Sequence, residues 1–132
     1  MIPVFDSWAI LALLRGEPAA ERIEPYFERG DGVMSVVNYT EVLYQIIREY
    51  GTDRADRFSN EVIAPDSKLE ILVAAPRQAR RAAAIKARGG LSLADAFAAA
   101  LAIDKEGILL TGDPELRLAS QRWGFALEWL GP

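Results

Sequence analysis

Residues 109–116 read LLTGDPEL: an apolar run ends at Gly112, and the carboxylate of Asp113 and then Pro114 follow directly. An apolar run closed by glycine is typical of a buried strand, and proline is typical of the first position of a helix. Asp113 therefore stands where a strand passes into a helix, and its side chain is suited to cap that helix. Ligands also bind at such junctions in parallel α/β sheets, so capping is one of two interpretations of Asp113.

Strand and helix patterns alternate along the rest of the chain. The predicted strands cover residues 2–5, 32–37, 69–74, 107–111 and 125–130. The predicted helices cover residues 7–14, 18–30, 38–51, 53–63, 76–88, 92–103 and 114–123. Pro25 interrupts the pattern of the second helix. Strands separated by helices predict an α/β fold with a mainly parallel sheet, and a chain of 132 residues without repeats or linkers predicts a single domain, residues 1–132.

The composition excludes several kinds of chemistry. The chain has no cysteine and no histidine, which rules out thiol nucleophiles, Ser-His-Asp triads and zinc sites built on those residues. A net charge of −4 argues against a broadly basic surface for nucleic acid, although residues 76–90 form a basic stretch. The N-terminus lacks a basic region and carries Asp6 inside its apolar run, so neither a signal peptide nor a membrane span is predicted and a cytoplasmic protein is expected.

Four carboxylates flank the predicted helix starts: Asp6, Glu41, Asp95 and Asp113. Each of them has a purely structural explanation. The first and the last directly precede predicted helices, as N-cap residues do. The other two close the motifs Asn38-x-x-Glu41 and Ser92-x-x-Asp95, which resemble capping boxes. Taken one at a time, these carboxylates predict helix caps.

The predicted topology gives the same four carboxylates a second interpretation. The C-terminal ends of parallel strands share one edge of the sheet, and Asp6 and Asp113 follow two such ends. Glu41 begins the helix that leaves this edge, and Asp95 lies there if its helix runs antiparallel to the strands. Two helices precede the fourth strand, so sequence leaves their directions open. Clustered carboxylates repel one another unless a cation neutralises them, and Mg²⁺ or Mn²⁺ is the natural partner of such oxygens.

The strand that ends at Asp6, the segment VVNYTEVLYQ around Glu41, LSLADAFAAALA around Asp95 and LLTGDPEL resemble the motifs of PIN-domain nucleases, and more narrowly those of VapC-type toxins of toxin–antitoxin pairs. The resemblance covers essentially the whole chain in order and spacing. It implies a three-layer α/β/α fold with a mostly parallel five-stranded sheet. It also implies that Asp6, Glu41, Asp95 and Asp113 are the catalytic, metal-binding residues.

The same resemblance implies an activity and supporting residues. The expected activity is endonucleolytic cleavage of RNA with one or two Mg²⁺ or Mn²⁺ ions, in which metal-activated water leaves 5′-phosphate and 3′-hydroxyl ends. Ser7, Asn38 and Thr111 match supporting polar positions of the family, although each also suits a cap or a turn. The expected contacts with RNA phosphate, which are the least specific of these expectations, are Arg15, Lys86 and Arg88.

Partners follow from the resemblance as well. A VapC-type toxin implies a cognate antitoxin protein that covers the active-site groove, and dimers are common in the family. An apolar surface for such a contact is suggested, beside ordinary core packing, by four residues: Tyr44, Ile47, Tyr50 and Phe58.

Three other interpretations were weighed. A haloacid-dehalogenase-like phosphatase needs a second aspartate two residues after the first, where this chain has Trp8. A response-regulator receiver needs adjacent acidic residues after the first strand, and these are missing. A non-catalytic PIN module that binds a protein or RNA partner stays as the alternative, and a broken acidic set would be its mark.

Overall fold

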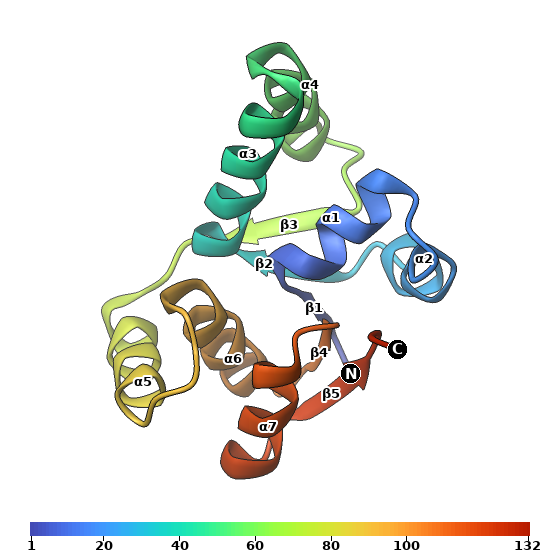
Figure 1. The fold of residues 1–132 in the computed structure, drawn as a ribbon. Helices are drawn as coiled ribbons and strands as arrows, with labels where there is room; N and C mark the ends of the chain where they lie inside the picture. Colours follow the sequence, from blue (N-terminus) through green and yellow to red (C-terminus); the bar gives the residue numbers. More distant parts are fainter.

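The computed structural model describes residues 1–132 and contains one five-stranded sheet with the strand order β3-β2-β1-β4-β5. The strands are β1 (Pro3–Phe5), β2 (Gly32–Ser35), β3 (Leu69–Leu72), β4 (Ile108–Thr111) and β5 (Ala126–Trp129). Every neighbouring pair is parallel. The helices are α1 (Ser7–Arg15), α2 (Ala20–Glu28), α3 (Val36–Tyr50), α4 (Thr52–Ile63), α5 (Pro76–Ala87), α6 (Leu93–Lys105) and α7 (Pro114–Trp123). Figure 1 shows helices on both sides of the sheet, which confirms the predicted α/β fold.

Each face of the sheet has its own hydrophobic core, because successive residues of a strand point to opposite faces. In β1, Val4 packs into the core that α5, α6 and α7 cover, whereas Phe5 packs into the core beneath α1 to α4. Helix α6 has alanine at nearly every buried position, so its backbone lies close to the strands. None of the helices is both long and apolar enough to span a bilayer.

The predicted element boundaries lie within two residues of the observed ones. Pro25 lies inside α2 and does not end it. One boundary difference affects the site: the strand predicted over residues 32–37 ends at Ser35, and α3 begins at once at Val36. Ser35 caps α3, because its hydroxyl accepts a hydrogen bond from the backbone N–H of Val37 at 3.2 Å.

Candidate functional site

The polar site lies between the C-terminal ends of β1 and β4. Strands β2 and β3 lie on one side of β1, and strands β4 and β5 lie on its other side. The connections therefore diverge between β1 and β4, which is where parallel α/β sheets have their ligand-binding crevice. Phe5 of β1 pairs with Leu110 of β4. Asp6 and Thr111, the residues that follow this pair, therefore also lie side by side. The parallel register alone brings together two side chains that are 105 positions apart in the sequence.

Asp6 is the most enclosed carboxylate of the site, with 1% of its surface exposed. Its Oδ1 accepts a hydrogen bond from the backbone N–H of Ala9 at 2.8 Å and so caps α1. Its Oδ2 accepts a hydrogen bond from the hydroxyl of Thr111. The Thr111 Oγ1 in turn accepts from the backbone N–H of Asp113 at 3.0 Å. Asp6 is thus both a helix cap and a member of a buried polar network. Thr111, the predicted supporting hydroxyl, belongs to the same network.

Three further carboxylates converge where α6 and α7 begin. Asp113 caps α7 by accepting from the N–H of Glu115 at 2.9 Å. Asp95 is placed by Ser92, whose hydroxyl oxygen accepts from the Asp95 N–H at 3.1 Å and caps α6. The Asp95 and Asp113 side chains share a hydrogen bond. Carboxylate oxygens of Asp95, Asp113 and Glu115 all lie within 4.8 Å of one another. Helix α6 therefore starts at the same sheet edge, which settles its direction.

Glu115 was not singled out from the sequence. The available signal was its place in Asp-Pro-Glu, which puts a second carboxylate in the first turn of α7. Acidic residues at helix N-termini are so common, because the helix dipole favours them, that this signal has little specificity by itself. Only its closeness to Asp95, which comes from another helix, gives Glu115 a place in the cluster.

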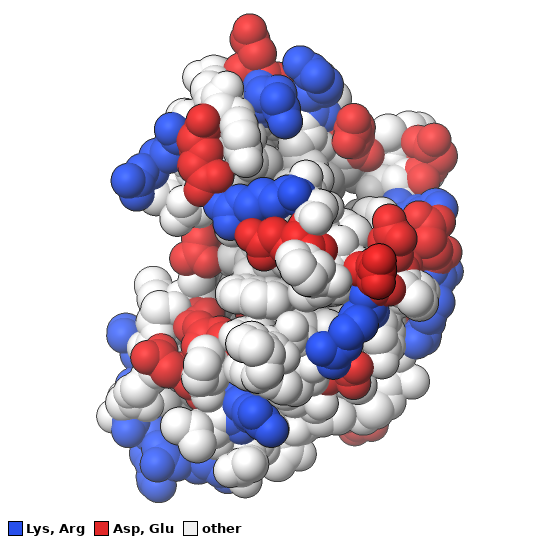
Figure 2. All heavy atoms as spheres, turned by 45° about the vertical axis from the view of Figure 1, so that its right-hand side comes forward, with Lys and Arg blue, Asp and Glu red and all other residues white.

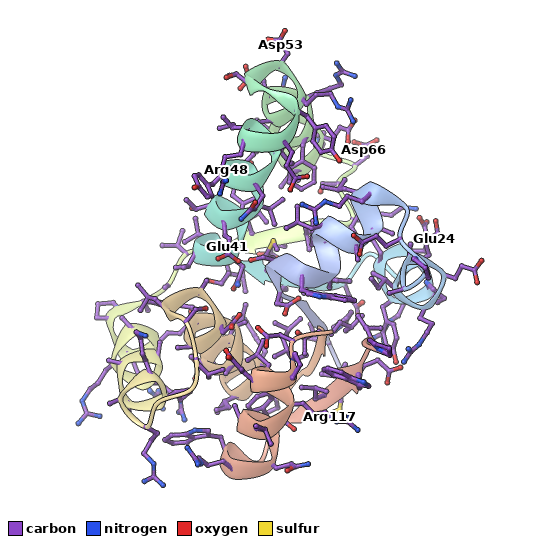
Figure 3. All side chains as sticks on the ribbon, in the orientation of Figure 1. Glu24, Glu41, Arg48, Asp53, Asp66 and Arg117 are labelled. Atoms are coloured by element: carbon purple, nitrogen blue, oxygen red, sulfur yellow. The ribbon has the colours of Figure 1, made fainter.

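The expectation for the start of α3 needs a correction. Asn38 does not cap α3, because Ser35 does, so the proposed Asn38-x-x-Glu41 capping box is wrong. Glu41 consequently lies in the second turn of α3 and not in the first. Figure 3 shows Glu41 on the part of α3 nearest to the start of α1. Its charge acts on Asp6, whose pKa it raises, so Glu41 still belongs to the electrostatic surroundings of the site.

Asn38 instead connects its own helix, α3, to the first turns of α1 and α6. Its Nδ2 donates to the Oγ of Ser7 at 3.3 Å and to the backbone oxygen of Ala94 at 3.2 Å. Ser7 Oγ donates to the backbone oxygen of Asn38 at 3.3 Å. Ser7 and Ala94 are the chain neighbours of Asp6 and Asp95. Asn38 is fully buried while its Oδ1 has no hydrogen-bond partner, an arrangement that is rare in purely structural positions.

The environment makes two of the carboxyl groups hard to ionise. Burial raises the pKa of Asp6 from 3.8 to about 7, against the hydrogen bonds from Thr111 and Ala9, and the charges of Asp113 and Glu41 raise the pKa further. Burial also raises the pKa of Asp95, to about 8, together with its hydrogen bond to Asp113 and the charges of Asp113 and Asp6. A positive charge among these oxygens would remove this penalty.

The three basic residues expected to contact RNA lie in two places. Arg15 is at the C-terminal end of α1, about 13 Å along the helix from Asp6, and forms an ion pair with Glu49 of α3. Lys86 donates to the backbone oxygen of Leu91 at 3.0 Å, and Arg88 follows α5 on the surface. The latter two thus lie beside the connection between α5 and α6.

The apolar residues expected to form a contact surface also divide. Tyr44, Ile47 and Tyr50 are about half exposed on α3. Phe58 is partly buried and packs against the ring of Tyr39 at 6.1 Å between centroids, so it belongs mainly to the core.

Residues 4–120 match the PIN domain family. The chain belongs to this family. The site described above thus occupies the matched region, and the predicted family membership is confirmed. A comparison with curated proteins gave no match.

Solved structures of VapC-type proteins share the fold of this PIN domain. VapC20 of Mycobacterium tuberculosis, described as a sarcin-ricin loop cleaving toxin, superposes with a TM-score of 0.75 at 14% identity, covering 94% of this chain and 96% of that one. DNA-bound VapBC of Salmonella typhimurium gives a TM-score of 0.73 at 17% identity and 98% coverage of both chains. FitAcB of Neisseria gonorrhoeae gives the same values.

Proposed function

We propose that this PIN domain is a metal-dependent endoribonuclease that acts as the toxin of a toxin–antitoxin pair. It hydrolyses RNA phosphodiesters with water and leaves 5′-phosphate and 3′-hydroxyl ends. The observation that carries this proposal is the convergence of Asp6, Asp95, Asp113 and Glu115, from three separate segments, at the crevice between β1 and β4. The likeness to the fold of VapC20, a toxin described as cleaving the sarcin-ricin loop, supports the substrate class.

The donor set fits a hard divalent cation. All the clustered side chains offer carboxylate oxygens, which Mg²⁺ and Mn²⁺ prefer, and the chain has neither cysteine nor histidine to favour zinc. Burial, together with the neighbouring carboxylates, raises the pKa of Asp6 and of Asp95, so a bound cation would favour the ionised form of both groups. Asp95, Asp113 and Glu115 would hold one or two ions directly, with Asp6 and Glu41 completing the anionic surroundings. When bound, such an ion supplies Lewis acidity toward phosphate oxygens and lowers the pKa of a water.

The protein's own residues set the geometry of this site. Thr111 holds the orientation of Asp6 and, through the Asp113 N–H, ties it to the start of α7. Asn38 and Ser7 hold α1, α3 and α6 together behind the carboxylates. Pre-organised side chains of this kind avoid rearrangement during the reaction, which is the main protein contribution in phosphoryl transfer.

The test is cleavage of purified RNA with Mg²⁺, Mn²⁺ or EDTA by the wild type and by Asp6→Asn. Asp53→Asn is the matched control, because Asp53 is an exposed aspartate at the start of α4, far from the site in Figure 3. We expect metal-dependent cleavage by the wild type and the control, a loss of at least about 100-fold in Asp6→Asn, and 5′-phosphate ends on the products.

Two results would contradict the proposal. Cleavage that survives both EDTA and Asp6→Asn would remove the carboxylates from the chemistry. Products with cyclic 2′,3′-phosphate ends would show attack by the ribose hydroxyl instead of water. If the folded, metal-loaded protein cleaves no RNA, including ribosomal and transfer RNA, the alternative of a non-catalytic binding module gains support.

The partners are a cognate antitoxin protein and a second copy of the chain. A structure from Klebsiella pneumoniae with the same fold is described as a toxin–antitoxin complex, which supports the first. The exposed stripe of Tyr44, Ile47 and Tyr50 along α3 supports a protein contact. For the homodimer, Ile47→Glu should reduce the mass measured by light scattering from twice that of the chain to that of one chain. An unchanged mass would exclude this stripe from the dimer contact.

A further inference from the structure

A groove lies between α7 and the connection from α5 to α6, next to the carboxylate cluster. Its volume is about 570 Å³, in the range of sites that bind small molecules. Glu115 belongs both to the wall of this groove and to the cluster with Asp95 and Asp113. The segments that line the groove, α7 and the connection after α5, lie in the lower left part of Figure 1. The groove and the proposed catalytic site therefore form one continuous surface.

The walls of the groove are apolar over most of their length. Ile85, Leu91 and Ala119 form its buried part, and Leu118 stands over it from α7 with 68% of its surface exposed. Trp123 closes the end away from Glu115, about 12 Å along α7. An exposed leucine and an indole beside a polar site suit a flat ligand with an apolar face, such as a nucleobase.

Two glycines line one side of this groove. Gly89 and Gly90 have φ of +90° and +86°, in the left-handed region where a side chain would be strained. No atom lies within 4 Å of the position that a Cβ would take at either glycine. The groove therefore has no side chain over these two glycines, and the Gly89 N–H is already held by the Lys86 oxygen at 2.9 Å, so the glycines leave room for a ligand without being assigned a hydrogen bond to it.

The groove has a carboxylate, Glu115, at one end and basic side chains elsewhere along it or near it. This distribution of charge suits a polyanion that meets the carboxylates at one end only. Arg122 lines the groove and takes part in no ion pair. Lys86 is held at the groove by its hydrogen bond to the Leu91 oxygen, and Arg88 precedes the two glycines. Elsewhere the surface mixes both signs, as Figure 2 shows for one face. Arg122 in the groove and Lys86 and Arg88 near it therefore supply local positive charge on a chain whose net charge is −4.

We infer that this groove binds one nucleotide of single-stranded RNA, adjacent to the phosphate that the carboxylate cluster receives. The base lies against Leu118 and the buried apolar wall, and the neighbouring phosphate lies toward Arg122. The groove thereby selects unpaired RNA, because only an unstacked base enters it. This inference rests on the proposed nuclease function and adds the position at which one nucleotide next to the reacting phosphate is bound.

The test measures binding separately from cleavage. A fluorescent single-stranded hexaribonucleotide of mixed sequence is titrated in Mg²⁺ with Asp6→Asn protein, which keeps the RNA intact, and anisotropy gives Kd. Leu118→Glu and Arg122→Gln are added to this background. Their matched controls are Ile63→Glu, an apolar side chain 74% exposed at the end of α4, and Lys105→Gln, at the end of α6 opposite Asp95. All four positions are on the surface, and thermal melts verify folding.

We expect Leu118→Glu to weaken binding by about ten-fold through the lost base contact and the added negative charge. Arg122→Gln should weaken binding by about three-fold and reduce the slope of log K against log salt by about 0.7, as expected for one phosphate contact on a single strand. The two control variants should bind like their parent. Replacing one nucleotide at a time by an abasic one should weaken binding to the parent protein at a single position, and this difference should vanish in Leu118→Glu.

Binding by the groove variants within two-fold of their controls would overturn the inference, as would an abasic scan without any sensitive position. These outcomes are distinct from failure of the nuclease proposal. If the wild type cleaves no RNA but Leu118→Glu weakens RNA binding, the groove stands and the catalytic proposal falls. If RNA is cleaved in the expected way and Leu118→Glu binds like Ile63→Glu, the groove inference alone falls.

Discussion

Replacing Asp6 by asparagine should stabilise the metal-free protein above neutral pH, although it removes a side chain proposed to be catalytic. The pKa of Asp6 is 3.8 in an ordinary environment and about 7 in the folded protein, mainly because of burial. The folded state therefore binds the Asp6 proton more tightly than the unfolded state does. The stability from this proton is fully present below about pH 4 and is lost as the pH rises through about 7.

The size of the effect follows from the two pKa values. Between about pH 5 and pH 8, linkage gives a loss of about 2–3 kcal/mol in the free energy of unfolding. For a domain of this size, such a change lowers Tm by roughly 10 °C. The raised pKa of Asp95 adds a loss in the same direction. Asparagine at position 6 carries no charge, keeps the acceptor for the Ala9 N–H and presents an amide to Thr111, so it removes only the contribution of Asp6.

The assay is differential scanning calorimetry in EDTA from pH 5 to pH 8, with Asp53→Asn as the control for loss of an exposed carboxylate. Asp6→Asn should melt above the wild type at both ends of this range, and the difference in Tm should widen by roughly 10 °C from pH 5 to pH 8, whereas Asp53→Asn should follow the wild type throughout. Parallel curves for the wild type and Asp6→Asn would refute the reasoning. So would a lower Tm of Asp6→Asn at pH 8, because it would show that hydrogen bonds to the carboxylate outweigh the cost of burying its charge.

Four further outcomes are expected. Mg²⁺ or Mn²⁺ at a hundredfold excess over Kd should stabilise the wild type at pH 8 by about 2–3 kcal/mol in calorimetry, and EDTA should reverse this; no shift would argue against a metal site. Asn38→Ala breaks two buried hydrogen bonds and should lower the free energy of unfolding in urea by about 2–4 kcal/mol, so a change below about 0.5 kcal/mol would count against the helix-joining role. Gly112→Ala puts a Cβ 2.3 Å from the ring of Trp8 and should cost about 1–3 kcal/mol and alter tryptophan fluorescence; unchanged emission and stability would contradict this close packing. Ser92→Ala removes the cap of α6 and should cost about 1 kcal/mol by the same urea assay, with wild-type stability as the opposing result.

Local sequence was sufficient where the interaction itself is local. Asp6, Ser92 and Asp113 cap the helices that follow them, as their positions predict, because a cap needs only a short side chain and an N–H two or three residues away. The same reasoning was wrong at Asn38. Two β-branched residues, Val36 and Val37, predicted that the strand continues. In the structure β2 ends at Ser35, which caps α3, and α3 begins at Val36.

The alternation of strands and helices was also sufficient to predict part of the site. A parallel sheet places all C-terminal strand ends at one edge, so the arrival of Asp6 and Asp113 at a common crevice required only the order of elements. That argument did not include the direction of α6, on which the place of Asp95 depends. Packing of its alanine-rich face against β1, β2 and β4 settles this direction, and contacts of that kind have no local signature.

The remaining features depend on distances between segments far apart in the chain. Glu115 joins the cluster through its closeness to Asp95, and Asn38 acquires its function through Ser7 and Ala94 on two other helices. The raised pKa of Asp6 requires burial, which belongs to the folded molecule and not to any single residue. The sequence alone therefore determined the class of fold, the caps of α1, α6 and α7, and the types of side chain at the site. Tertiary packing determined which of these side chains meet and how readily they ionise, because Coulomb energy and desolvation depend on distance and enclosure in space and not on separation along the chain.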